Sequence, residues 1–111
     1  ISSGTFLNIT GLDGGIIDGG NIVRLFNVSS STLSLSNLEL EHGNATSGGA
    51  IQASASDVNV TDCNITANSG TDFGGALFLE NSTLFFGGNV TFQRNGASHG
   101  GGVYAMTSSV T

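Results

Sequence analysis

The residues of this chain that could carry chemistry are, first, asparagines in the tripeptide Asn-x-Ser/Thr, the acceptor sequence for N-linked sugars. Seven such tripeptides occur, whereas random placement of the same Asn, Ser and Thr residues would give roughly 2.6. The acceptor positions are Asn8, Asn27, Asn44, Asn59, Asn64, Asn81 and Asn89. The excess predicts that several of these side chains carry N-glycans in a secreted protein.

Acidic residues show no comparable pattern for hydrolysis or elimination. A glycosidase needs two carboxyl groups roughly 5 to 9.5 Å apart, and elimination needs a base with calcium or basic side chains beside it. Asp57, Asp62 and Asp72 have no acid 26 residues before or after them, the interval at which this sequence repeats. Arg24 and Arg94 lie almost three repeats apart. The sequence therefore predicts no catalytic residues, and a non-enzymatic protein is expected.

The sequence predicts no metal site and no cofactor. Asp13 and Asp18 could contribute to a calcium site, but their loop lacks alternating oxygen ligands, and capping of turns is the favoured role. His42 and His99 lie in separate bends without a cysteine or second histidine at ligand spacing, so both are interpreted as solvent-facing turn residues. Cys63 has an inward-facing position and is interpreted as a small buried apolar residue.

Composition argues against several classes of partner. Two basic residues against eight acidic ones give a net charge of −6, so nucleic acid is not an expected partner. No apolar run approaches the roughly 20 residues of a bilayer span, so membrane insertion is not expected. Residues 1–4 lack the features of a signal peptide, and any such leader is expected to have been removed. A single cysteine cannot form a disulfide within the domain.

The segments that carry these residues repeat along the chain. Gly48-Gly49-Ala50-Ile51 recurs as Gly74-Gly75-Ala76-Leu77 and as Gly100-Gly101-Gly102-Val103, at intervals of 26 residues. A glycine pair before alternating apolar residues is typical of a tight bend that leads into a strand, and a period in the twenties is typical of one coil of a β-solenoid. Residues 1–111 are therefore expected to form a single repeat domain, or a segment of a longer array.

Each repeat contains three apolar pairs with the period-two alternation of strands. The first column is Leu7/Ile9, Leu33/Leu35, Val58/Val60 and Leu84/Phe86; the second is Leu38/Leu40, Cys63/Ile65 and Val90/Phe92; the third is Phe26/Val28, Ile51/Ala53, Leu77/Leu79 and Val103/Ala105. This stacking predicts an all-β fold, a right-handed three-sided parallel β-helix of about four coils, roughly 19 Å tall. Leu12 is expected to begin the second pair of the first coil, where residues 11–20 leave the register open.

Other polar and aromatic positions are assigned by their place in the coil. Asn68 and Asn95 follow the second apolar pair, with Gly43 in the equivalent place; a turn role is favoured because Asn and Gly tolerate positive φ. Phe78 and Tyr104 have outward parity on adjacent coils, where they could stack on a sugar or a partner, or cover a neighbouring loop. Among the acceptors, four lie at outward strand positions and three in bends: Asn8, Asn27, Asn59 and Asn64, then Asn44, Asn81 and Asn89.

Gly-Gly-Ala-Ile, together with Phe92-Gln93-Arg94-Asn95, resembles the paired Gly-Gly-Ala-[Ile/Leu/Val] and Phe-x-x-Asn repeats of the chlamydial polymorphic outer membrane proteins. Similar repeats occur in large surface proteins of algae and other protists. The resemblance covers Gly48 to Val103 well and the first 40 residues loosely, although Ile65 replaces the Phe of one motif and residues 40–43 keep neither end of another. It implies a pectin-lyase-like β-helix at a cell surface, most often adhesive or structural.

The function expected from these features is that of a structural, extracellular, N-glycosylated module that forms a filament, surface appendage or wall layer. The alternatives are a cell-surface adhesin or carbohydrate-binding module and, more remotely, a polysaccharide-active enzyme. Leu7 to Val110 spans four complete coils, so the first and last coils stop at the same corner, without an evident cap. Head-to-tail self-association is expected from this match, and a fragment of a longer chain would explain it equally well.

Overall fold

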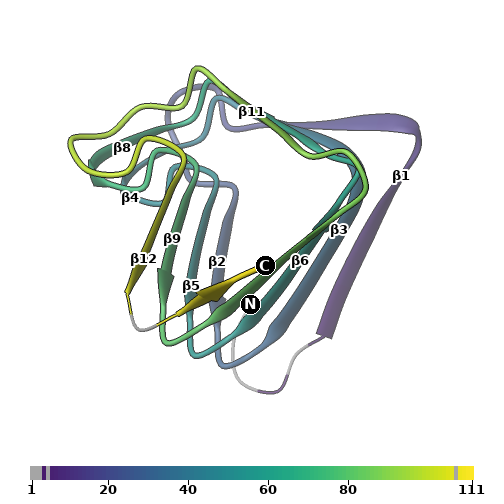
Figure 1. The fold of residues 1–111 in the computed structure, drawn as a ribbon. Coiled ribbons are helices and arrows are strands. Elements are labelled where there is room, and N and C mark those ends of the chain that lie inside the picture. Colours follow the sequence, from purple (N-terminus) through teal and green to yellow (C-terminus); the bar gives the residue numbers. More distant parts are fainter. Residues whose placement is uncertain (1–3, 5, 107) are drawn as a thin grey trace.

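The protein is a β-solenoid of about four coils built from parallel strands (Figure 1), which confirms the predicted fold class. The structure is a computed structural model that describes residues 4, 6–106 and 108–111, apart from the side chains of residues 12–14. Among the described residues, no helix is long and apolar enough to span a membrane.

Three faces enclose the core, and one short ladder projects at a corner (Figure 1). The first face stacks β1 (Phe6–Asp18), β3 (Thr32–Glu41), β6 (Asp57–Thr61), β10 (Thr83–Gly87) and β13 (Ser109–Val110). The second contains the later halves of β1 and β3 with β7 (Asn64–Thr66) and β11 (Thr91–Gln93). The third contains β2 (Phe26–Ser29), β5 (Ile51–Ser54), β9 (Leu77–Glu80) and β12 (Val103–Met106). The projecting ladder, which the repeat pattern did not predict, pairs β4 (Asn44–Ser47) with β8 (Ser69–Phe73).

The apolar columns stack in the predicted register. Leu33 lies beside Val58 and Val58 beside Leu84, while Leu40 lies beside Ile65 on the second face. All of these side chains are buried, because parallel pairing without register shifts between these coils directs the same face of each strand inward. The central coils therefore form one continuous apolar core.

The first coil departs from the expected register. Ile9 pairs with Leu35, but the register then shifts, and Gly15 and Ile17 lie opposite Leu38 and Leu40. Leu12 therefore does not begin the second pair, because the chain bulges between Thr10 and Gly15. The side chain of Leu12 lies outside the described residues.

The two glycines of the repeated motif have different roles. Gly48 and Gly74 have φ of 62°, a conformation that side-chain-bearing residues rarely adopt. Gly49 has no such φ, but a Cβ there would overlap the carbonyl oxygen of Gly75 and the backbone of Ser69. The first glycine provides the bend, and the second lets neighbouring coils approach.

Asn68 and Asn95 do lie in the turn, but not for the expected reason. The residue with positive φ is the preceding one, Ala67 (54°) or Arg94 (54°). The asparagines instead form a ladder of side-chain hydrogen bonds: Asn68 Oδ1 accepts from the Gly43 N–H (2.8 Å), and Asn95 Oδ1 accepts from the Asn68 N–H (3.0 Å) and Nδ2 (3.1 Å).

A ladder of serines stabilises another corner. The N–H groups of Ser31, Ser56 and Ser82 donate to the hydroxyl oxygen of the serine one coil later, at 3.0–3.1 Å. Each of the hydroxyls of Ser56, Ser82 and Ser108 donates to the carbonyl two residues before it. Both ladders provide hydrogen-bond partners for backbone groups in the turns, where strand pairing is interrupted.

Candidate functional site

The seven acceptor asparagines are distributed over the outside of the solenoid, and none of them is buried. Five are exposed and two are half-buried: Asn8, Asn27, Asn64, Asn81 and Asn89 are in the first group, and Asn44 and Asn59 in the second. Asn44 was expected in a bend, but it begins strand β4. Its Nδ2 donates to the Asn21 carbonyl (3.0 Å). Asn59 lies between Ser34 and Phe85 of the neighbouring coils.

The aromatic pair expected at the surface is largely covered. Phe78 stacks on Tyr104 with ring centroids 5.6 Å apart and an interplanar angle of 2°, but Phe78 is only 9% exposed. Phe73, at the end of β8, packs against both rings, at 6.2 Å and 4.8 Å. His99 stacks on Phe73 at 5.1 Å. For Phe78 this packing fits the second of the two expected roles, covering a neighbouring loop, whereas Tyr104 stays half-exposed.

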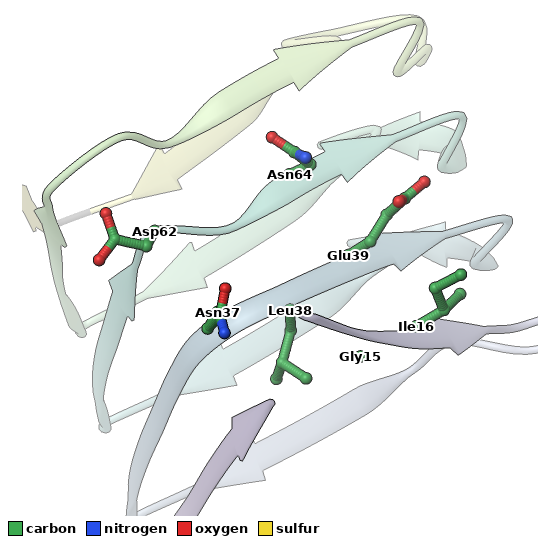
Figure 2. Close-up of a pocket in the computed structure, with 7 residues that line it drawn as sticks. All are labelled: Gly15, Ile16, Asn37, Leu38, Glu39, Asp62 and Asn64. Carbon is green, nitrogen blue, oxygen red and sulfur yellow. The ribbon is translucent and has the colours of Figure 1, made fainter. Parts of the chain in front are cut away.

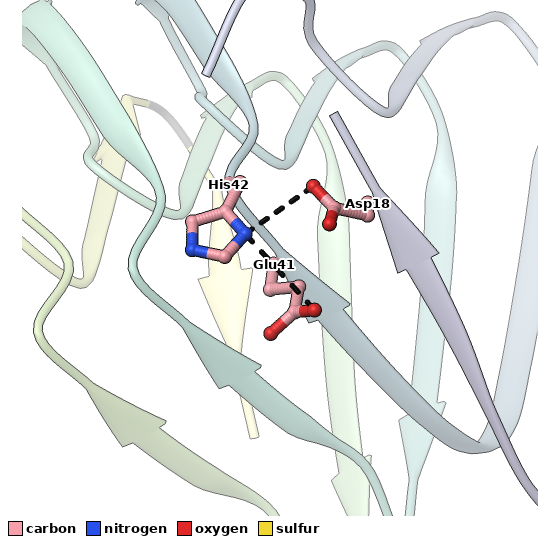
Figure 3. Close-up of side chains that lie close together, drawn as sticks. All are labelled: Asp18, Glu41 and His42. Carbon is pink, nitrogen blue, oxygen red and sulfur yellow. Dashed lines mark hydrogen bonds and ion pairs between the residues drawn. The ribbon is translucent and has the colours of Figure 1, made fainter. Parts of the chain in front are cut away.

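Two coils bring an aspartate, a glutamate and a histidine together (Figure 3). Asp18 ends β1 and lies beside Glu41, which ends β3 in the next coil. His42 follows in the turn with φ of 56°. Its Nδ1 lies 3.2 Å from Asp18 Oδ1 and 4.0 Å from Glu41 Oε1. This cluster is not evident from the sequence, because neither histidine has a second histidine or a cysteine at ligand spacing, and the repeat pattern leaves the register of the first coil open.

Negative charge is concentrated around this cluster. The pKa of Glu41 is raised, first by burial, then by a hydrogen bond and repulsion from Glu39, and by repulsion from Asp18; His42 acts in the opposite direction. Asp18 Oδ1 also accepts the Gly20 N–H at 2.8 Å, which is the turn-capping role expected for this residue. The side chain of Asp13 lies outside the described residues.

Two cavities border Glu39. One, of about 270 Å³, is drawn in Figure 2 and is lined by Gly15, Ile16, Asn37, Leu38, Glu39, Asp62 and Asn64. Figure 2 shows the carboxylates of Glu39 and Asp62 projecting in different directions, so they do not face each other across a substrate position. The other, of about 470 Å³, is bordered by Glu39, Glu41, His42 and Arg94 among others.

Cys63 points into the core, as predicted, and is 1% exposed. Its Sγ donates to the Thr61 carbonyl at 3.2 Å, and burial raises the pKa of the thiol. Burial therefore keeps the sulfur protonated and unreactive.

The chain has no match among protein-family models, curated proteins or solved structures.

Proposed function

We propose that this protein is a structural, extracellular, N-glycosylated β-solenoid whose copies stack end to end into a filament or surface appendage. The observation that carries the proposal is the contrast between central and outermost coils. Leu35 and Leu79 are completely buried, whereas Ile9 and Val103, in the same columns at the two ends, are half-exposed, and Ala105 is exposed. Within residues 4–111, the core is therefore less covered at the two outermost coils than at the centre.

In the described part of the chain, the outermost strand β12 also presents an unpaired hydrogen-bonding edge. The carbonyls of Gly102 and Met106 accept from the N–H groups of Leu77 and Asn81 in the coil below. Because successive residues of a strand direct their backbone groups to opposite sides, the N–H of Ala105 points away from that coil. A further parallel strand would pair there and cover the exposed core.

A second copy of this chain is the occupant that fits both ends. Leu7 and Val110 lie in one column with Leu33, Val58 and Leu84, so a copy stacked on the last coil would continue the column with apolar residues. Such a contact joins two different surfaces and repeats without closing. Four coils at ~4.8 Å give a rise of about 19 Å per subunit.

N-glycans would limit association to the ends. The chain has only ten charged side chains, so its outer faces have little charge repulsion to keep them apart. Sugars on the acceptor asparagines would cover those faces and leave the ends free.

The glycans can be tested by mass. We expect the chain secreted from a eukaryotic host to exceed its peptide mass of 11.1 kDa. Peptide mapping should show higher occupancy at the exposed Asn81 and Asn89 than at the half-buried Asn44 and Asn59, because the enzyme and the sugar need access to the amide. A secreted chain with only the peptide mass would contradict this part of the proposal.

The assembly is tested by Ala105→Pro. Proline removes the outward N–H but no hydrogen bond to the coil below, so the solenoid should fold while stacking is blocked. Light scattering of the glycosylated natural chain should show that particle mass increases with protein concentration. The association constant of the variant should be at least about tenfold lower.

Ala105→Val is the matched control, since valine keeps the N–H and favours strands. It should assemble like the natural chain, and circular dichroism should show all three proteins folded. A natural chain that stays monomeric at high concentration would refute end-to-end stacking, and so would Ala105→Pro filaments equal to those of the control.

A further inference from the structure

The cluster of Asp18, Glu41 and His42 has the geometry of a metal site. One potential ligand atom from each residue lies within 4.8 Å of the other two. Ligands bound at 2.0–2.2 Å around one ion are separated from each other by roughly 3 to 4.4 Å. The measured separations from Nδ1, 3.2 Å to Asp18 and 4.0 Å to Glu41, lie in that range (Figure 3).

The charges around the cluster give a second, independent reason. Glu39 adds a third carboxylate beside Glu41, and the sequence contains no lysine. The Arg24 guanidinium donates to the carbonyls of Ser47 and Gly48 instead. Within the described part of the chain, His42 is the only basic side chain within ion-pair distance of these acids. A divalent cation would offset the repulsion that neighbouring carboxylates exert on one another.

The surroundings leave room for an ion and its water ligands. The cavity of about 470 Å³ borders Glu41 and His42, so the coordination positions not taken by the protein would face solvent. The Gly20 N–H holds the Asp18 carboxylate through Oδ1, and this kind of support orients carboxylate ligands in metal sites.

We propose that Asp18, Glu41 and His42 bind a divalent first-row transition metal ion, with Zn²⁺ as the best-suited member. An imidazole nitrogen with two carboxylates favours such ions, whereas Ca²⁺ takes six to eight oxygen ligands and Mg²⁺ is bound mainly through oxygen. The ion links the first coil, through Asp18, to the second coil, through Glu41 and His42. It therefore fastens the irregular first coil to the rest of the solenoid.

The proposal is tested by calorimetric titration of the whole chain with ZnCl₂ near neutral pH. The expected result is one Zn²⁺ per chain, with affinity lowered at least about tenfold in His42→Asn and in Asp18→Asn, because a neutral amide replaces the imidazole or the carboxylate and is a weaker ligand for Zn²⁺. Asparagine is chosen at position 42 because it tolerates the positive φ there while removing the imidazole. Without zinc, His42→Asn should melt close to the natural chain.

His99→Asn is the matched control, since His99 is the other histidine and stacks on Phe73 rather than on acids. It should bind Zn²⁺ as the natural chain does. Hydrogen exchange should show that Zn²⁺ slows exchange in β1 of the natural chain and the control, and not in His42→Asn. The proposal is overturned if Zn²⁺ does not bind, if His42→Asn binds it equally well, or if Ca²⁺ binds more tightly than Zn²⁺.

Discussion

Replacing Leu35 with aspartate is expected to abolish folding. Leu35 is 0% exposed and lies between Ile9 and Val60 in the first column of the core. An aspartate there would put an unpaired carboxylate into an apolar interior and also remove a buried leucine. The combined cost is at least about 5 kcal/mol, which is comparable with the whole stability of a typical domain.

The matched control is Ser34→Asp, one residue earlier on the same strand. Ser34 is half-exposed and lies between Asn8 and Asn59, so the new charge would reach water and have no acid directly opposite it in either neighbouring coil. We expect its free energy of unfolding to change by less than about 1 kcal/mol. Urea unfolding followed by circular dichroism measures both variants. A cooperative transition for Leu35→Asp near that of the control would show that the register is wrong.

The sequence predicts the three faces well because a parallel solenoid repeats each position directly above itself. Leu33, Val58 and Leu84 lie on the inward-facing side of their strands. A shift of the strand register by one residue would turn all three side chains outward. The serine ladder was present in the same pattern, since Ser31, Ser56 and Ser82 recur at the coil interval. It was not predicted because serine in a turn is interpreted as a polar surface residue, and here these serines are buried.

Features that depend on one coil covering another could not be predicted from local pattern. The side chain of Phe78 points outward from its strand, but an outward side chain is exposed only where no other segment covers that face. Phe73 of β8 packs over Phe78 and covers it. The bulge in β1 adds residues before Gly15, so the spacing from Asp18 to His42 is shorter than one regular repeat. Without that register, the acid and the histidine could not be placed together.

Asn68 provides the sharpest test of the difference between the sequence interpretation and the structure. If Asn68 were present for its tolerance of positive φ, Asn68→Gly would be harmless, since Gly43 fills the equivalent place one coil earlier. In the structure, Asn68 is 1% exposed, accepts from the Gly43 N–H and donates to the Leu40 carbonyl at 3.1 Å. Glycine would leave the buried Gly43 N–H without its partner and remove the added hydrogen bond to the Leu40 carbonyl, at a cost of about 1–3 kcal/mol.

Ala67→Gly is the control that separates the two interpretations. Ala67 holds the positive φ of this turn, so glycine there should leave stability unchanged or raise it by up to about 1 kcal/mol, because it relieves the strained conformation. Asn95→Ala should cost only about 1 kcal/mol, because Asn95 is half-exposed and water can replace its amide. Thermal and urea unfolding of the three variants measures the order of their stabilities. If Asn68→Gly is as stable as the natural chain while Ala67→Gly is not, the asparagine ladder does not hold the coils together, and the backbone angle alone explains why asparagine recurs in this turn.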